Sequence, residues 1–312
     1  MKLIKTEDAV GQVLCHDITQ IIKGVTKDAV FRKGHIITQE DIPVLLSVGK
    51  DNIYVWEKDE NMLHEDEAAD ILRGICQSEN MHATAPKEGK IELIADTDGL
   101  LLIDLERLRA INALGDMMIA TRPSGFMVKK GDKLCGTRVI PLVIAKERME
   151  QAKKLAGSEP IIRLVPVRPR KYGLVTTGNE VFYGRIQDTF TPVVEAKLAE
   201  LGCEMVFCSG GMSVDPDDKT PLAIKNTGAK IVSYGAPVLP GAMFLLGYFE
   251  DGTPVMGLPG CVMYAKRTIF DLVLPRIMAD ETLTQQDLSA LGHGGLCLSC
   301  PVCTFPNCGF GK

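Results

Sequence analysis

Two groups of residues in this chain have types and spacings that suit chemistry, and the first is a set of carboxylates beside glycine-rich turns. Glu180 closes the turn TGNE at 177–180, and Asp218 follows the run SGG at 209–211. A third turn, GLPG at 257–260, precedes a long helical pattern. Glycine lets the backbone come close to a ligand, so several N–H groups can point at one oxygen. The three turns favour a small phosphorylated ligand, although one turn alone could simply join a strand to a helix.

The second group is a set of four closely spaced cysteines in the Gly- and Pro-rich tail at 292–312: Cys297, Cys300, Cys303 and Cys308. Two overlapping C-x-x-C steps and a C-x-x-x-x-C step would bring four thiolates around one small volume. Soft thiolates suit zinc or an iron–sulfur cluster, and the spacing leaves both open. We therefore predict a metal-binding tail, and the alternative is a tail without a ligand.

Parallel strands are the elements that must position the glycine-rich turns. Each turn follows a short apolar run typical of a buried strand, at 174–176, 205–208 and 255–256. In an open α/β sheet, ligands bind at the carboxyl ends of the strands. If the three strands lie in one parallel sheet, their turns meet at one edge and can form a single pocket.

Five segments in this order resemble the molybdopterin-binding domain shared by molybdopterin adenylyltransferases and molybdopterin molybdotransferases. The segments are TTGNE at 176–180, GRIQD at 184–188, SGGMSVDPDDKTP at 209–221, VLPGAMF at 238–244 and GLPGCVM at 257–263. The resemblance covers about residues 168–280. It implies an α/β fold, a three-layer α/β/α domain with a mostly parallel sheet, and a role in molybdenum cofactor biosynthesis.

The resemblance also implies which residues surround the ligand, a molybdopterin or molybdenum cofactor. These are Thr177, Gly178, Asn179, Glu180, Asp188, Ser209, Gly210, Gly211, Met212, Ser213, Asp218, Pro240, Gly241, Leu258, Pro259 and Gly260. Asp218 and Glu180 match acidic positions of the family and are the predicted catalytic residues, with Asp218 placing Mg²⁺ against the group being transferred. The bland alternative for the acidic run at 215–218 is a polar turn with a helix cap.

Three departures from the family pattern leave the reaction open. Asn179 stands where the family carries aspartate, Cys261-Val262 replaces the usual Asn-Pro after GLPG, and only eight positions separate Gly202 from Gly210. The short spacing suggests that one strand–helix unit is missing, which would uncover apolar surface and an open strand edge. The alternatives to a transferase of adenylyl or molybdate are a non-catalytic cofactor carrier or regulator with a metal- or redox-sensing tail, and a competence-damage-type phosphohydrolase.

Composition limits the class of protein and its partners. The chain has 312 residues, 46% hydrophobic and 24% charged, and a net charge of -5. It has no apolar run of about 20 residues and no apolar signal-type segment at the N-terminus, so we expect a cytoplasmic protein with no membrane partner. The negative charge argues against nucleic acid. The expected partners are a pterin phosphate, with ATP, molybdate or a molybdoenzyme as further possibilities, and a homo-oligomer is expected.

The patterns divide the chain into four parts: a small α+β module at 1–58, a β-rich domain at 59–150, the α/β domain at 160–282 and the tail at 292–312. Within them, the run HEDE at 64–67 predicts a capped, solvated helix start. The turn at 96–99 predicts a hairpin between strands at 91–94 and 100–103. The run after GLPG predicts one helix over 262–278.

Overall fold

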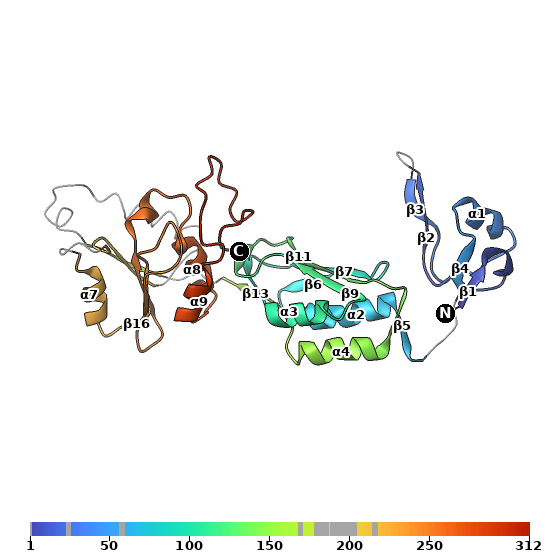
Figure 1. Ribbon diagram of the computed structural model, residues 1–312, viewed down its shortest axis with the longest axis horizontal. Coiled ribbons are helices and arrows are strands. Elements are labelled where there is room, and N and C mark those ends of the chain that lie inside the picture. The colour runs from blue at the N-terminus through green and yellow to red at the C-terminus, as the bar shows by residue number, and fades with distance from the viewer. Residues whose placement is uncertain are drawn as a thin grey trace. The chain divides into compact units, whose positions relative to one another are not determined.

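The structure is a computed structural model that describes residues 2–22, 26–55, 60–167, 171–177, 187, 205–213 and 218–312 (Figure 1). The chain divides into two compact units. Unit 1 comprises residues 1–94, 104–122 and 133–163, and unit 2 comprises residues 95–103, 123–132 and 164–312. The predicted four-part division therefore stays a prediction, since two short middle segments group with the C-terminal unit.

The N-terminal part of unit 1 contains both helical and strand elements. Its elements are β1 (Lys2–Lys5), the 3₁₀ helix η1 (Thr6–Asp8), β2 (Ile18–Ile22), β3 (Thr26–Phe31), α1 (Asp41–Ser47) and β4 (Asn52–Val55). β1 pairs with β4 and β2 pairs with β3, both antiparallel. Buried apolar side chains from the loops, α1 and β4, among them Leu14, Ile37, Leu45 and Ile53, form its core.

The rest of unit 1 is a sheet accompanied by three helices. Its elements are β5 (Met62–His64), α2 (Glu65–Cys76), β6 (Met81–Ala83), β7 (Lys90–Ala95), α3 (Leu105–Asn112), β9 (Met117–Thr121), β11 (Lys133–Val139), β12 (Val143–Ala145) and α4 (Lys146–Ala156). The four-stranded sheet has the order β6-β7-β11-β9, and β12 pairs with β5. Strand β7 alternates between exposed and buried positions, which is the pattern of a sheet with one covered face.

The predicted hairpin around residues 96–99 is wrong. β7 pairs with β11, whereas β8 (Gly99–Ile103) pairs with β10 (Phe126–Val128) in a different sheet. All five residues of β8 are buried, so this strand needs cover on both faces. Asp98, in the turn, accepts hydrogen bonds from the backbone N–H of Lys130 at 2.8 Å and from Lys129 Nζ at 2.9 Å. The turn residues thus hold a second loop rather than close a hairpin.

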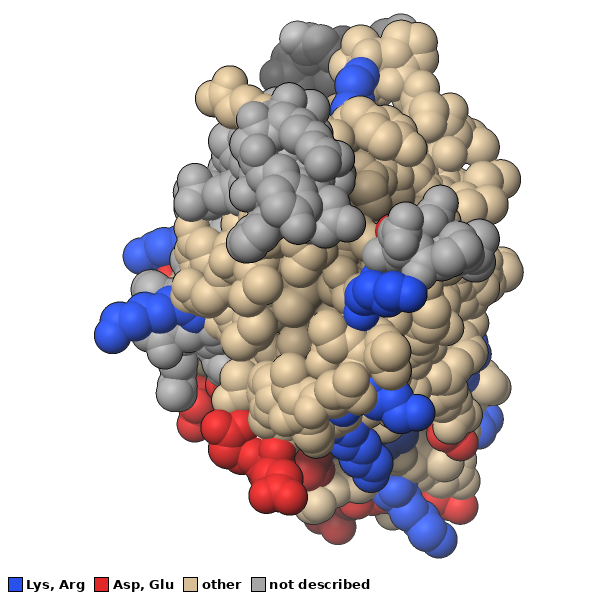
Figure 2. Space-filling view, turned by 90° about the vertical axis from the view of Figure 1, so that its left-hand side faces the viewer, with Lys and Arg blue, Asp and Glu red and all other residues tan. Residues whose placement is uncertain are grey.

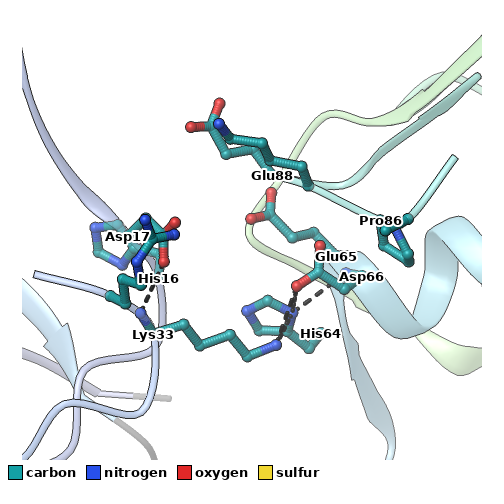
Figure 3. A pocket seen from close by; sticks show the side chains of 11 residues that line it. His16, Asp17, Lys33, His64, Glu65, Asp66, Pro86 and Glu88 are labelled. Atoms are coloured by element: carbon teal, nitrogen blue, oxygen red, sulfur yellow. Dashed lines mark hydrogen bonds and ion pairs between the residues drawn. The ribbon is translucent and has the colours of Figure 1, made fainter. Parts of the chain in front are cut away.

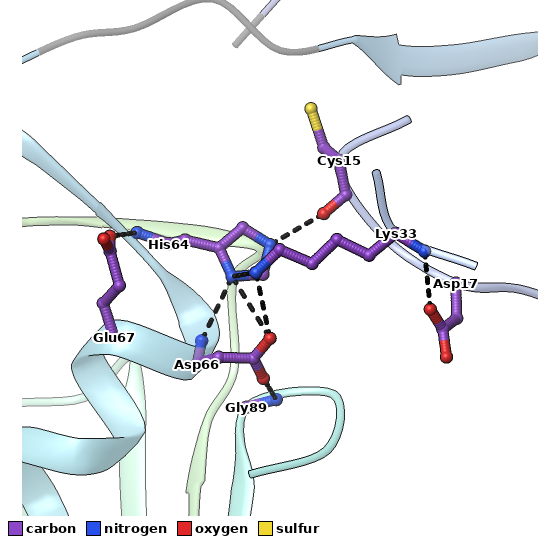
Figure 4. A network of polar contacts seen from close by, with 7 residues as sticks. All are labelled: Cys15, Asp17, Lys33, His64, Asp66, Glu67 and Gly89. Carbon is purple, nitrogen blue, oxygen red and sulfur yellow. Dashed lines mark hydrogen bonds and ion pairs between the residues drawn. The ribbon is translucent and has the colours of Figure 1, made fainter. Parts of the chain in front are cut away.

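The start of α2 is capped as predicted, but it is not solvated. His64 is the N-cap, and the backbone N–H of His64 donates to Glu67 at 2.9 Å, which completes a capping box. The side chain of His64 is buried, and both of its ring nitrogens have partners (Figure 4). Its Nε2 lies 2.8 Å from the carbonyl oxygen of Cys15, and its Nδ1 lies 2.9 Å from Lys33 Nζ. Lys33 also pairs with Asp66 at 3.1 Å. Residues from the N-terminal module therefore bury this helix start.

Unit 2 contains a five-stranded sheet in the order β14-β15-β18-β17-β16. The strands are β14 (Gly173–Thr176), β15 (Val206–Ser209), β16 (Lys230–Tyr234), β17 (Leu245–Tyr248) and β18 (Pro254–Leu258), and a second sheet has the order β10-β8-β13, with β13 at Ile162–Pro166. β14, β15 and β18 run parallel, whereas β17 is antiparallel to both of its neighbours. Four of the five strands thus point the same way, and two of the four strand pairs are antiparallel.

Helices lie on both faces of this sheet. Along β15, Phe207 packs with the side of α8 (Ile269–Met278), whereas Cys208 packs with Ile224 of α7 (Thr220–Asn226). Figure 1 shows α7 and α8 on opposite sides of the strands. The mixed α/β class is confirmed, and the complete three-layer arrangement stays a prediction.

The helix predicted over 262–278 is interrupted. A 3₁₀ turn, η2 (Gly260–Met263), ends first, and α8 begins only after Thr268. Thr268 and Asp271 form a capping box, in which the Thr268 N–H donates to Asp271 at 2.8 Å. The cap starts a new helix because it satisfies N–H groups that a continuous helix would bond internally.

The tail after α9 (Gln285–Ala290) packs on unit 2. Leu239 N–H donates to Gly295 O at 2.8 Å, and Cys297 N–H donates to Leu239 O at 2.8 Å. Phe310 is 4% exposed and belongs to the main apolar core of the unit. The tail is therefore part of the α/β fold and is not an appendage.

None of the helices within the described ranges is long and apolar enough to cross a membrane. On the face in Figure 2, uncharged residues form most of the visible described surface, with Lys and Arg side chains down the lower right and acidic side chains at the lower left.

Candidate functional site at the strand ends of the α/β unit

The ends of β14, β15 and β18 lie side by side, as the glycine-rich turns predicted. Thr176, the last residue of β14, is in register with Ser209, the last residue of β15. Ser209 is in turn in register with Leu258, the last residue of β18. The residues that follow therefore leave the sheet at one edge, which is the geometry that open α/β sheets use for ligands.

Thr177 ties the first two strand ends together. Its N–H donates to Ser209 O at 2.8 Å, and its Oγ1 lies 2.8 Å from Thr220 Oγ1. Gly210 has a φ of +90°, and a Cβ built on it would collide with the carbonyl oxygen of Thr177. Glycine is therefore required at position 210 both by its backbone conformation and by the close approach of the neighbouring turn.

Ser209 has an unusual polar environment. It is fully buried, and its Oγ makes no hydrogen bond with any described residue. An unpaired buried hydroxyl is costly, on the order of 1–3 kcal/mol, so natural structures rarely keep one without a function. Its position at the end of β15 makes it a candidate contact for a ligand at the sheet edge.

Asp218 closes the loop that begins at Gly210. One carboxylate oxygen accepts the backbone N–H of Ser213 at 2.6 Å. A Cβ at Gly211 would lie 3.5 Å from the other oxygen of Asp218 and 3.1 Å from Thr220 Oγ1. The glycine pair and the predicted catalytic carboxylate thus face each other within one short loop.

Tyr234 and Met212 support this loop from below. Tyr234 Oη donates to the carbonyl of Met212 at 2.9 Å, and burial together with the negative charge of Asp218 raises the pKa of Tyr234. Met212 is buried, and its sulfur would lie 2.7 Å from a Cβ placed on Gly257 of β18. Neither Tyr234 nor Thr220 was predicted from the sequence. Thr220 lies inside the motif at 209–221, whereas Tyr234 carries no local signal.

The two remaining predicted loops lie in different surroundings. Leu258 is buried, whereas a Cβ on Gly260 would meet no described atom within 4 Å. Gly241 is packed against the start of α8, where Ile269 N–H donates to Pro240 O at 3.2 Å. Pro240 also lines a cavity of about 530 Å³ beneath the tail.

The predicted residues Gly178, Asn179, Glu180 and Asp188 lie outside the described residues. So does the position of the missing strand–helix unit. Their roles stay predictions. Asp218 is the predicted catalytic residue whose contacts the structure describes.

The four tail cysteines line the same largely apolar cavity as Pro240, and none of them is in a disulfide. Among the described residues, no three His, Cys, Asp or Glu side chains gather into a group that could hold a metal ion. The carbonyls of Cys300 and Pro301 instead accept hydrogen bonds from Lys266, at 3.4 and 2.7 Å. The described tail therefore does not fit a zinc or iron–sulfur centre in this conformation.

The described residues also supply only part of what a magnesium site needs. The described residues supply Asp218 to the predicted site, and one of its oxygens already accepts a backbone N–H. Mg²⁺ usually needs one or two carboxylates together with waters and substrate phosphates. Asp218 fits part of that requirement, and the other predicted carboxylates lie outside the described residues.

Comparisons with known proteins find two family matches. Residues 3–57 match a domain of unknown function, and residues 203–279 match the probable molybdopterin binding domain. The second match contains β15, β18 and Asp218. No curated protein matches the chain.

Two solved structures are similar at low identity. A molybdenum cofactor biosynthesis protein from Pyrococcus furiosus is 11% identical with a TM-score of 0.19, over 89% of this chain and 62% of that protein. The molybdopterin biosynthesis MoeA protein from Pyrococcus horikosii is 12% identical with a TM-score of 0.27, over 70% of this chain and 79% of that protein. Scores this low carry no argument about the present chain, which spans 62% of the length of the first protein. The family match alone confirms the resemblance seen in the motifs: residues 203–279 match the model of the probable molybdopterin binding domain.

Proposed function

We propose that the chain binds a molybdopterin-type pterin phosphate at the ends of β14, β15 and β18 and acts in molybdenum cofactor biosynthesis. The observation that carries the proposal is the position of the loop from Gly210 to Asp218. This loop lies inside the segment that matches the molybdopterin binding domain, and it starts at a strand end in register with two others.

Each described residue of the site has a defined part in binding. Gly210 and Gly211, both with positive φ, allow the phosphate to approach backbone N–H groups closely. The Ser209 hydroxyl, which has no described partner, can donate a hydrogen bond to the pterin phosphate. Thr177 and Thr220 hold the first two loops at a fixed separation, so the ligand meets a preformed pocket.

As a transferase, the protein would move adenylyl from ATP, or molybdate, to the bound pterin. Mg²⁺, when bound, supplies positive charge that neutralises the phosphate or molybdate oxygens. Asp218 is the residue that would hold the ion, together with Glu180 and Asp188. The protein's own contribution is orientation and charge placement.

A second candidate is a carrier that hands the cofactor to a molybdoenzyme without catalysis. Two observations favour it: Asn179 replaces the family's aspartate, and the described part of the site contains one carboxylate, Asp218. Adenylyl and molybdate transfer by the wild type and by Asp218→Ala separate the candidates. A transferase loses turnover in Asp218→Ala, and equal turnover in both proteins would contradict the role of Asp218. Absence of turnover in the wild type, with pterin retained, supports the carrier.

The tail remains a proposed zinc or iron–sulfur site that requires Cys297, Cys300, Cys303 and Cys308 to close around a metal. Metal analysis of protein purified without oxygen tests it. A Cys300→Ser, Cys303→Ser variant should lose the metal, and a metal-free wild type would contradict the proposal.

A further inference from the structure

Unit 1 contains a cavity of about 370 Å³ that is separate from the strand-end site. His16, Asp17 and Lys33 of the N-terminal module line one side, and Glu65 and Glu88 line another (Figure 3). Its volume falls within the range of small-molecule sites.

Lys33 is held in place at this cavity and is not available as a ligand for an anion. Its Nζ lies 2.9 Å from His64 Nδ1 and 3.1 Å from Asp66 Oδ2. Burial lowers the pKa of His64, which keeps the ring neutral and able to accept the lysine proton. Asp66 also accepts the Gly89 N–H at 3.1 Å, so its carboxylate is engaged as well.

Glu65 is the group in this cavity that lacks a partner. Only 8% of Glu65 is exposed, and its carboxyl points into the cavity in Figure 3. Its backbone N–H donates to Leu142 O at 2.9 Å, but its carboxyl group makes no hydrogen bond or ion pair with any described residue. Burial, reinforced by the charges of Asp66 and Glu88 and opposed by those of Arg138 and Lys33, raises the pKa of Glu65 to about 7. An isolated buried carboxylate is costly, and a nearby cation would stabilise it.

A second polar atom, in a residue that lines the cavity, has no described partner. His16 Nδ1 is buried and makes no hydrogen bond with the described residues, and His16 lines the cavity beside Asp17. Burial lowers the pKa of His16, so its ring is neutral at pH 7 and has an acceptor nitrogen. The cavity therefore presents a buried carboxyl and a neutral imidazole.

The carboxyl of Glu65, rather than the sum of the charges around the cavity, favours a positive ligand. Arg32 and Lys87 also line it, but the Arg32 side chain is 73% exposed and Lys87 is exposed, so both can extend into solvent. A metal ion is disfavoured because no three suitable side chains gather among the described residues. An organic cation needs only one carboxylate and a few acceptors.

We propose that this cavity binds a small organic cation with N–H donors, an amine or a guanidine, through the carboxylate of Glu65. The N–H groups donate to the carboxylate of Glu65, and the positive charge offsets the buried negative charge. This inference is independent of the pterin site, which lies in unit 2.

Calorimetric titration of the full chain with methylguanidinium tests the proposal. Because Glu65 is protonated below its raised pKa, binding must expel a proton there, and affinity should rise about tenfold per pH unit below pH 7 before levelling off. Heats measured in buffers with different ionisation enthalpies report the released proton. Tetramethylammonium, which has charge without donors, and methylurea, which has donors without charge, should bind at least tenfold more weakly.

Two variants make the test specific to Glu65. Glu65→Gln keeps the shape and removes the charge, so it should abolish methylguanidinium binding and proton release while the far-ultraviolet circular dichroism is retained. Glu79→Gln, an exposed position beyond the other end of α2, should bind like the wild type. Equal binding by Glu65→Gln, no binding by the folded wild type at millimolar ligand, or preferential binding of Mg²⁺ would each overturn the proposal.

Discussion

Gly210 and Gly228 have nearly the same backbone conformation, with φ of +90° and +89°, but different surroundings. A Cβ on Gly210 would collide with the Thr177 carbonyl, whereas a Cβ on Gly228 would meet nothing within 4 Å. Alanine at either position pays the cost of a left-handed residue, about 1–2 kcal/mol. Gly210→Ala should lose a further 1–3 kcal/mol or so, because the two loops must separate. Urea unfolding measures both variants, and equal losses would show that the loops are not in close contact.

Glu65 makes a prediction about pH that needs no ligand. Its carboxyl has a pKa raised from 4.5 to about 7, so the folded state binds the proton more tightly than the unfolded state. This contribution to stability is complete below pH 4.5 and is lost as pH rises to about 7, by roughly 3 kcal/mol in total. Glu65→Gln should remove that slope in urea unfolding of the chain between pH 5 and 8. A wild type and variant with parallel pH profiles would contradict the buried, unpaired state of Glu65.

Sequence patterns identified the strand-end residues better than the residues that support them. Gly210, Gly211 and Asp218 belong to one short motif, and its glycines are needed for the positive φ angles of the local backbone. Tyr234 lies on β16, and it contacts Met212 only because β16 joins the same folded sheet, two strands from β18. The burial of His64 involves Cys15 and Lys33, which are far away in the sequence, and HEDE by itself looks like a solvated helix start. Contacts between distant segments are invisible to local patterns.

At the scale of elements, the same distinction explains which predictions were right. The short apolar runs before the glycine turns became β14, β15 and β18. For β15 and β18, which are largely buried, the reason is that a strand covered on both faces needs a continuous apolar stretch, whereas β14 is a partly exposed edge strand. The turn at 96–99 has hairpin chemistry, but turn chemistry does not choose the partner of a strand, and β7 and β8 joined different sheets. The helix predicted over 262–278 begins only at Ile269, after a separate 3₁₀ turn, because the Thr268–Asp271 capping box sets its start.

The tail offers a prediction at this scale. Phe310 is 4% exposed in the core of unit 2, whereas Val302 in the same tail is 76% exposed. Phe310→Ala should destabilise unit 2 by about 3–5 kcal/mol, because it leaves a cavity in the core. Val302→Ala should change stability by less than about 0.5 kcal/mol. Thermal unfolding compares the two, and a silent Phe310→Ala would mean that the tail is not packed as described.

For the whole molecule, the edge of the large sheet is the feature that bears on assembly. Among the described residues β14 is an edge strand, and Val175 on it is 49% exposed. An open edge with an apolar side chain is a site for pairing with another chain. The missing strand–helix unit inferred from the spacing of Gly202 and Gly210 would leave this edge uncovered.

We therefore expect a homo-oligomer that pairs through β14. Val175→Lys should shift the protein to monomer in light scattering coupled to size-exclusion chromatography, because a charge on an edge strand opposes pairing. Leu222→Lys on α7, at a position 57% exposed, is the control and should leave the assembly unchanged. A wild-type monomer with a cooperative, high-temperature melt would contradict both the open edge and the partner that covers it.

The central claim is that the ends of β14, β15 and β18 hold a molybdopterin-type pterin, and the pterin content of protein purified without oxygen tests it most directly. The pterin is quantified by fluorescence after oxidation, in the wild type, in Ser209→Ala and in the control Ser289→Ala on α9. Ser209 Oγ has no described partner to lose, so Ser209→Ala should fold normally. The wild type and the control should retain pterin, and Ser209→Ala should bind it about 10–100-fold more weakly, the worth of a hydrogen bond to a charged group. A folded wild type without any pterin affinity, or equal retention by Ser209→Ala, would contradict the account.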